Sequence, residues 1–152
     1  MYKCENNFLE NSTNLKITNV LTSVNFPWFL NQKEKIFQHI FLKEKKENSN
    51  FIDILEPFMN KFNNEMEYAD CKLIPQSNKS TIILKKQNTF QEDKFIKFFY
   101  YLNTSNGYQL ISIKNQISLV KNKMVLFDNQ LKNQFFTPTD VNQILIEILF
   151  KK

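Results

Sequence analysis

From about residue 68 onward, the chain is divided into short apolar segments separated by turn residues, and this pattern most constrains the fold. The turns fall at 76–79, 105–107, 114–115 and 128–129, and the strand candidates are 69–74, 80–87, 95–102, 108–113, 116–120, 123–128 and 142–150. Short strands at regular spacing are typical of β-sandwiches and barrels. We therefore expect a mainly β fold of the α+β class, built as a two-sheet jelly-roll barrel.

Residues 1 to about 66 differ, because they mix short extended pieces with helix. Apolar residues recur at helical spacing over 51–62, at Phe51, Ile52, Leu55, Phe58, Met59 and Phe62. This spacing predicts an amphipathic helix, with Asn50 as its N-cap and Asp53 at the capping-box position. Pro57 lies inside the run and implies a kink. We expect the helices to pack on one side of the barrel.

The composition limits the chemistry that the chain can perform. Its 152 residues suit a single domain spanning 1–152, and 42% hydrophobic residues, with sixteen Phe, suffice for a core. There is one histidine (His39), one glycine (Gly107) and no arginine. Glycine-rich phosphate loops, nucleophile elbows and Cys/His zinc sites are therefore excluded. Asn106 and Gly107 predict a tight turn, since both residues tolerate a positive φ.

The charge and cysteine content bear on partners and compartment. The net charge is +5, but the lysines are scattered among acidic and polar neighbours, and specific nucleic-acid sites usually also use arginine. We do not expect nucleic-acid binding. Cys4 and Cys71 are two isolated cysteines, so reduced thiols are the default. No secretory signal or membrane-spanning run is present, which predicts a soluble cytoplasmic protein without a membrane partner.

The segment from Tyr100 to Tyr108, YYLNTSNGY, carries a resemblance to a known family, together with Phe90-Gln91-Glu92-Asp93 just before it. These residues resemble the metal-binding strand and turn of small prolyl-hydroxylase-like members of the 2-oxoglutarate/Fe(II)-dependent oxygenase family. Weaker matches occur in order along the chain, at 26–31, 37–41, 70–76, 123–128 and 139–140. The likeness covers roughly residues 24–150. It implies a double-stranded β-helix, which is a cupin-like jelly roll.

The same resemblance assigns the positions that carry the family's chemistry. Active members hold iron with two histidines and one carboxylate. The first histidine falls on Gln91, the carboxylate on Asp93 and the distal histidine on Asn133. The arginine that binds 2-oxoglutarate falls on Gln143, or on Ile144 if the alignment slips by one. Only Asp93 keeps its family residue, so we expect no catalytic residues, no iron and no 2-oxoglutarate.

Three interpretations of function remain open. The leading one is a non-catalytic homologue that acts as a binding or scaffolding module for an unknown protein or peptide partner. The alternative is an active 2-oxoglutarate/Fe(II) dioxygenase whose atypical metal site includes Asp93, Asn133 and Gln91. A second alternative is a basic accessory protein that binds nucleic acid. Two residues also have competing interpretations, since His39 and Trp28 suit either packing roles or roles as ligand and cleft wall.

Overall fold

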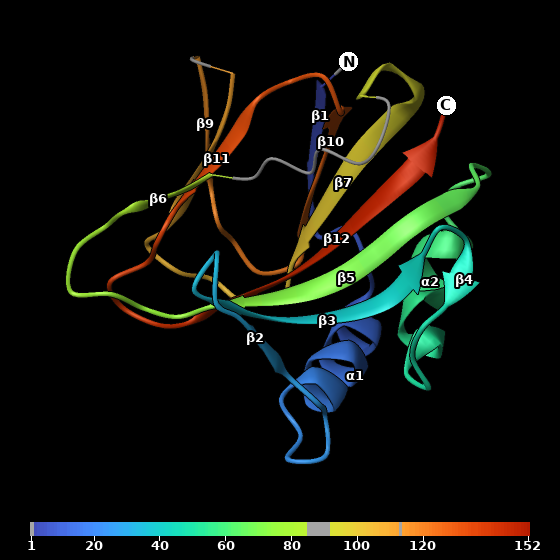
Figure 1. The fold of residues 1–152 in the computed structure, drawn as a ribbon, viewed down its shortest axis with the longest axis horizontal. Helices are drawn as coiled ribbons and strands as arrows, with labels where there is room; N and C mark the ends of the chain where they lie inside the picture. The colour runs from blue at the N-terminus through green and yellow to red at the C-terminus, as the bar shows by residue number, and fades with distance from the viewer. Residues whose placement is uncertain (1, 85–91, 113) are drawn as a thin grey trace.

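A computed structural model describes residues 2–84, 92–112 and 114–152, and the strands in this part of the chain form two antiparallel sheets (Figure 1). The eight-stranded sheet runs β1 (Tyr2–Asn6), β10 (Lys123–Asp128), β7 (Phe95–Tyr101), β12 (Gln143–Lys151), β5 (Met66–Ile74), β3 (Ile36–Lys43) and β2 (Phe29–Asn31), with β4 (Lys46–Glu47) also paired to β3. The four-stranded sheet runs β6 (Ile82–Leu84), β11 (Asn133–Phe136), β8 (Tyr108–Ile111) and β9 (Asn115–Ser118). The chain crosses repeatedly between the sheets, which confirms the predicted jelly roll.

The inner faces of the two sheets pack against each other and form one core. Phe99, Tyr101, Val125, Phe127, Phe135 and Leu145 belong to this inner core and are fully buried. Alternation along β7 sends Phe99 and Tyr101 inward and Phe98 and Tyr100 outward, as the period of a strand requires. The prediction that this strand is apolar on both sides is therefore confirmed.

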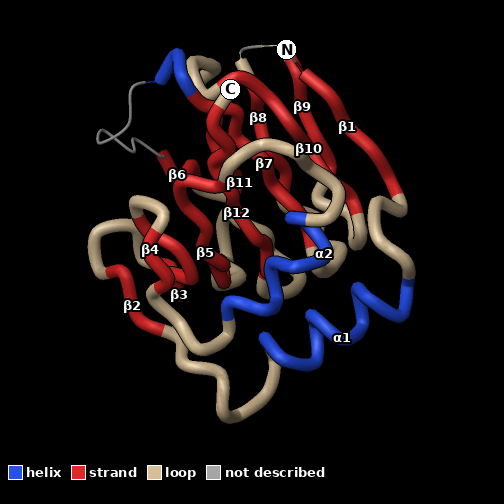
Figure 2. The backbone as a smooth tube through the Cα atoms, turned by 90° about the vertical axis from the view of Figure 1, so that its right-hand side faces the viewer, coloured by secondary structure: helices blue, strands red, loops and turns tan. Residues whose placement is uncertain are grey.

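The helices cover the outer face of the eight-stranded sheet, where they form a second core (Figure 2). This outer core joins Ile17 and Leu21 of α1 (Asn11–Leu21) and Phe58 of α2 (Glu56–Met59) to residues of the sheet. The prediction of helices on one side is confirmed. The sequence pattern does not indicate α1, because the helix has no side-chain cap and buries only Asn14, Ile17 and Leu21.

The predicted helix over 51–62 is wrong in length and in its start. The segment forms a 3₁₀ turn, η1 (Ile52–Leu55), followed by the four-residue α2. The N-terminal hydrogen bond comes from Ser49, whose Oγ accepts the N–H of Phe51 at 3.0 Å. Pro57 lies in the first turn of α2, where its missing N–H costs nothing, so it begins a helix rather than kinking one.

From residue 68 onward, the predicted strands correspond to those of the described chain with one omission, whereas β1, β2, β3 and β4 form in the first part, where the prediction named only short extended pieces. Segments 69–74, 95–102, 108–113, 116–120, 123–128 and 142–150 match β5, β7, β8, β9, β10 and β12 within a few residues. The candidate 80–87 overlaps β6, while its residues 85–87 lie outside the described part of the chain. The missed strand is β11, which has only four residues and begins with two polar ones.

Candidate functional site

Two of the three predicted metal positions, Asp93 and Asn133, lie at one end of the barrel. Asp93 is exposed in η2 (Glu92–Lys94), directly before β7, and Asn133 is the first residue of β11. Gln91 lies outside the described residues. The N–H of Asn129 donates to the carbonyl of Phe95 at 3.1 Å, so the loop that leads into β11 passes the start of β7. The fold therefore brings Asp93 and Asn133 to the same end.

The side chain of Asn133 points into the barrel with Phe135, because both occupy inward positions of β11. Asn133 is 5% exposed, and its Oδ1 has no hydrogen-bond partner among the described residues. A neutral amide oxygen is a much poorer ligand for Fe(II) than imidazole. This position therefore holds an unsatisfied acceptor where the family resemblance places a histidine.

Gln143, the predicted position of the family arginine, begins β12 and is fully buried. Its Oε1 accepts a hydrogen bond from Ser105 Oγ at 2.7 Å, and its Nε2 donates to the carbonyl of Asn103 at 3.0 Å. Ile144 instead packs on the outer core, so the alternative position points away from the barrel interior. The amide of Gln143 is thus used to hold the 103–105 turn, and it carries no positive charge for a ligand carboxylate.

The turn at 103–107 connects β7 to β8 and is fastened to the segment that precedes β12. Asn106 Nδ2 donates to Thr139 Oγ1 at 2.8 Å, and its backbone N–H donates to the Asp140 carboxylate at 3.1 Å. These backbone contacts lower the pKa of Asp140. Asn103 Oδ1 accepts the N–H of Ile144 at 2.8 Å. The segment that most resembles the oxygenase family therefore serves to close one end of the barrel.

The turn at Asn106-Gly107 was predicted for the wrong reason, because neither residue has a positive φ. Gly107 is needed for space. A Cβ atom at this position would lie 2.9 Å from the carbonyl oxygen of Phe136 and 3.2 Å from the backbone nitrogen of Pro138. Two strand connections can approach this closely only where one of them lacks a side chain.

His39, the one histidine of the chain, lies on the outer face of β3. Its Nδ1 is 2.7 Å from the carbonyl of Pro27 and its Nε2 is 2.6 Å from Ser49 Oγ. Its ring packs against Phe26 and Phe41, with centroids 4.7 and 5.1 Å away. These contacts confirm that His39 is a packing residue, separated from the barrel interior by the sheet itself.

Trp28 also has a packing role, which favours the first of its two interpretations. Its Nε1 donates to the carbonyl of Leu21 at 3.1 Å, and its half-buried ring packs edge-on against Phe26 at 5.1 Å. The residue therefore anchors the end of α1 to the outer core. It contributes nothing to the inner face of the barrel.

A buried charge network lies on the inner face of the eight-stranded sheet, and no candidate site predicted from the sequence includes it. Lys72 Nζ lies 2.8 Å from the Asp70 carboxylate and also contacts the carboxylate of Glu147. Lys97 Nζ is 3.7 Å from Glu147. All four residues are at most 4% exposed, although they come from the three strands β5, β7 and β12. The formal charges of the four side chains sum to zero.

Neutral polar groups extend this network toward the surface. Tyr68 donates to Asp70 Oδ2 at 2.8 Å, and Gln38 Nε2 donates to the Tyr68 hydroxyl at 3.0 Å. Burial lowers the pKa of Lys72, but the attraction of Asp70 and Glu147 outweighs it and raises the pKa well above its usual value. Burial, followed by the charge of Asp70, raises the pKa of Tyr68. The ammonium and the phenol therefore persist at neutral pH.

A sequence signal for the network does exist. Tyr68, Asp70 and Lys72 alternate with apolar residues along one strand, and Lys97 and Glu147 are single charges inside apolar strands. Charged residues are almost never fully buried unless they are paired. Pairing between distant strands, however, depends on the strand order.

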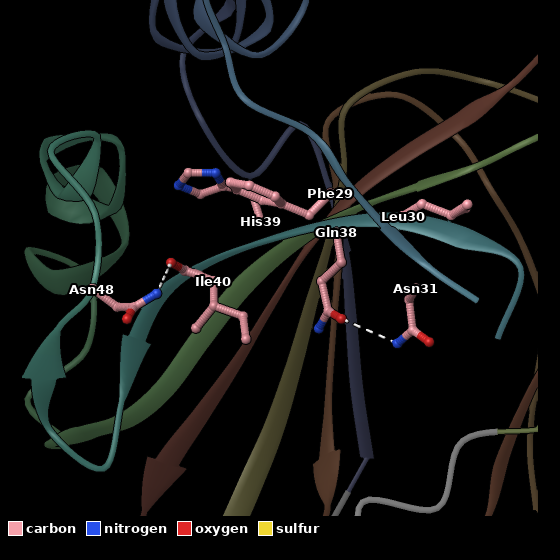
Figure 3. A pocket seen from close by; sticks show the side chains of 7 residues that line it. All are labelled: Phe29, Leu30, Asn31, Gln38, His39, Ile40 and Asn48. Carbon is pink, nitrogen blue, oxygen red and sulfur yellow. Dashed lines mark hydrogen bonds between the residues drawn. The ribbon is translucent and has the colours of Figure 1, made fainter. Parts of the chain in front are cut away.

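Gln38 also lines a surface pocket of about 410 Å³ beside β2 and β3 (Figure 3). Figure 3 shows the side chains of Gln38 and Asn31 on one side of the two strands, with their amides 3.3 Å apart. On the other side the rings of Phe29 and His39 stack, with centroids 5.9 Å apart. Through Gln38 the polar side of this pocket reaches the buried charge network.

The described residues do not fit an iron and 2-oxoglutarate site. Within 2–84, 92–112 and 114–152, no three His, Cys, Asp or Glu side chains gather closely enough to hold a metal ion. Asp93 is exposed, Asn133 presents an amide, and Gln143 is engaged by the 103–105 turn. The same part of the chain contains no helix long and apolar enough to cross a bilayer.

No protein-family model and no curated protein matches the chain. Solved structures do match, over 99% of the chain. They include a 2-oxoglutarate-Fe(II) oxygenase family oxidoreductase from Burkholderia pseudomallei, with TM-score 0.73, 8% identity and 84% of that chain covered. A prolyl hydroxylase from Trichoplax adhaerens, in complex with a hypoxia-inducible-factor peptide fragment, matches with a TM-score of 0.64 and 12% identity, and 83% of that chain is covered. The viral collagen prolyl hydroxylase of Paramecium bursaria Chlorella virus-1, in complex with 2-oxoglutarate, matches with a TM-score of 0.62 and 12% identity, and 94% of that chain is covered.

These matches show the fold. The chain has the double-stranded β-helix of 2-oxoglutarate/Fe(II) oxygenases, as its sequence resemblance predicted. The identities of 8–12% among these neighbours are too low to carry their activities over to this chain.

Proposed function

We propose that this protein is a non-catalytic homologue of the 2-oxoglutarate/Fe(II) oxygenases and uses its barrel as a binding module. The position of His39 carries the proposal. A two-histidine metal site needs two imidazoles in the barrel, whereas this chain has one, on the outer face of the sheet with both nitrogens engaged. The chain also lacks the arginine that would hold a ligand carboxylate in two parallel hydrogen bonds.

Two unsatisfied polar atoms inside the barrel support a binding role. Gln109 Nε2 and Asn133 Oδ1 are buried without a hydrogen-bond partner among the described residues. Gln109 is paired with Phe135 and Asn133 with Ile111, so the two amides are diagonal neighbours on one sheet face. The Cα atoms of such diagonal neighbours lie about 7–8 Å apart. An unpaired buried polar group costs about 1–3 kcal/mol, which a bound ligand would recover.

The ligand class follows from these atoms. Gln109 offers a donor, since its Oε1 already accepts from the Tyr101 hydroxyl, and Asn133 offers an acceptor. A small neutral molecule that carries both an acceptor and a donor, such as a primary amide or an alcohol, would satisfy both. The polar side chain of a peptide partner would meet the same requirement.

Thermal melts with Mn(II), 2-oxoglutarate and both together test the non-catalytic part of the proposal. We expect an unchanged midpoint, because a ligand raises it only by binding the folded state. Incubation with Fe(II), ascorbate and 2-oxoglutarate should release no succinate above a protein-free control. Succinate release that disappears in a folded Asp93→Ala variant would instead establish the dioxygenase alternative, which rests on the shared fold and the retained Asp93.

A melt screen of small amides and alcohols tests the binding part. A compound that stabilises the wild type should lose its effect in Gln109→Leu and Asn133→Leu, which remove the donor and the acceptor. It should keep its effect in Asn31→Leu, a matched amide substitution at the surface pocket. Equal stabilisation of all four proteins would place the ligand elsewhere and contradict the proposal.

A further inference from the structure

The strand β1 leaves an open edge on the eight-stranded sheet. It pairs with β10 in an uninterrupted register from Tyr2↔Phe127 to Asn6↔Lys123, and it ends the strand order. Among the described residues no strand pairs with its other edge, and Tyr2, Lys3, Cys4 and Asn6 are exposed. An open edge presents unpaired N–H and C=O groups, to which another strand can add.

We propose that this edge joins two copies of the chain, with β1 of one copy antiparallel to β1 of the other about a two-fold axis at Cys4. The sequence Tyr2-Lys3-Cys4-Glu5-Asn6 is self-complementary in this register. Lys3 of each copy then lies opposite Glu5 of the other, and Tyr2 lies opposite Asn6. Opposite charges on directly facing residues stabilise a strand pair.

The charges also select this register over its neighbours. A two-fold axis at Lys3 would place the two Lys3 side chains opposite each other, and an axis at Glu5 would do the same for the two carboxylates. Like charges at facing positions are destabilising. Lys3 and Glu5 form an ion pair of 3.0 Å within the strand, and their side chains are 60% and 41% exposed. Both are therefore accessible to a second copy.

The interface is small, because each copy contributes one strand of five residues. Interfaces of this size are typical of transient association. The register nevertheless has a specific chemical consequence. Facing residues of antiparallel strands have Cα atoms about 4.5 or 5.5 Å apart, and both values lie within the range of disulfide bonds. Cys4 is exposed and Cys71 is buried, so only Cys4 would be cross-linked between copies.

Cross-linking with diamide tests the proposal. The two Cys4 thiols lose two protons and two electrons to diamide, which is reduced to the hydrazine as the disulfide forms. We expect the wild type and Cys71→Ser to yield dimers, and Cys4→Ser to yield none. Sedimentation of the untreated wild type should show a reversible dimer whose fraction rises with concentration. A sedimentation coefficient that stays at the monomer value up to about millimolar protein would overturn the proposal.

Variants that reverse the charge of Lys3 or of Glu5 distinguish this register from nonspecific electrostatic attraction between the copies. Lys3→Glu and Glu5→Lys should each cross-link at least tenfold more slowly than wild type, because like charges then face each other. A mixture of the two, one of them labelled with ¹⁵N, should recover the wild-type rate as mixed dimers. Lys16→Glu, an exposed site on α1 with the same change in net charge as Lys3→Glu, should leave the rate unchanged. Single variants that cross-link as fast as wild type, or a mixture that stays slow, would exclude this register.

Discussion

At the scale of single residues, the side chains that most distinguish this barrel are the charges inside it. Lys72 is enclosed by Asp70 and Glu147, and Lys97 supplies the second positive charge. A buried ion pair brings little net stability in comparison with apolar residues, but removal of one partner leaves an uncompensated charge. The chain is therefore more sensitive to changes in this network than to changes at its surface.

Lys72→Met should lower the free energy of unfolding by about 3–5 kcal/mol, because Asp70 would lose its cation and Lys97 alone would remain beside the two carboxylates. Urea denaturation measures the loss. Lys45→Met is the matched control, since Lys45 pairs with Glu65 at 3.0 Å on the surface, where the pair is screened by water. We expect no measurable change there. Equal effects of the two substitutions would contradict the importance of burial.

The buried tyrosines should make the protein sensitive to alkali. Burial raises the pKa of Tyr68, Tyr100 and Tyr101. Below pH about 10 these phenols are neutral in both the folded and the unfolded chain, so their contribution to stability is fully present. Above it the unfolded chain loses these protons first, and stability falls as the pH rises. Lys72 acts in the same direction, because its pKa is also raised.

Phenolate absorbance during an alkaline titration measures this effect. Tyr68, Tyr100 and Tyr101 should ionise only together with the loss of far-ultraviolet circular dichroism. Gradual ionisation of all five tyrosines while the fold persists would show that the three are accessible to water.

At the scale of elements, the turn at 103–107 links two connections that are distant in sequence. Its hydrogen bonds to Thr139, Asp140 and Ile144 fasten the β7–β8 turn to the start of β12. The family resemblance identified this segment, and the tight turn was predicted. Its partners could not be read from local sequence, because they follow only after the chain has crossed between sheets.

Gly107→Ala should destabilise the protein by about 1–3 kcal/mol, through overpacking against the backbone of Phe136 and Pro138. No backbone strain is involved, because φ at Gly107 is negative. Gln116→Ala, at an exposed position of β9, should change stability by less than about 0.5 kcal/mol. A Gly107→Ala variant as stable as wild type would mean that the two connections can move apart without cost.

At the scale of the whole molecule, the eight-stranded sheet is shared by both cores. Its outward residues pack against the helices and its inward residues pack against the four-stranded sheet. If the eight-stranded sheet unfolded, the apolar residues of both cores would become exposed to water. We therefore expect the chain to unfold as one unit, which the prediction of a single domain also requires.

Unfolding curves followed by two different signals should coincide if the chain unfolds as one unit. Trp28 reports on the outer core through its fluorescence, and far-ultraviolet circular dichroism reports on both sheets. The two signals should give the same urea midpoint, as two-state unfolding requires. Midpoints that differ beyond error would show that the helix side and the barrel separate.

The fold class can be predicted from the amino-acid sequence, because alternating apolar residues and turn residues are local features of the chain. The sequence also sets the chemical limits, since one histidine and no arginine constrain any arrangement of the chain. The location of His39, the requirement for Gly107 and the set of charges that share the barrel interior become known only from the folded chain. Each of these depends on contacts between strands far apart in sequence. Such contacts are decided by strand order and register, which no local pattern encodes.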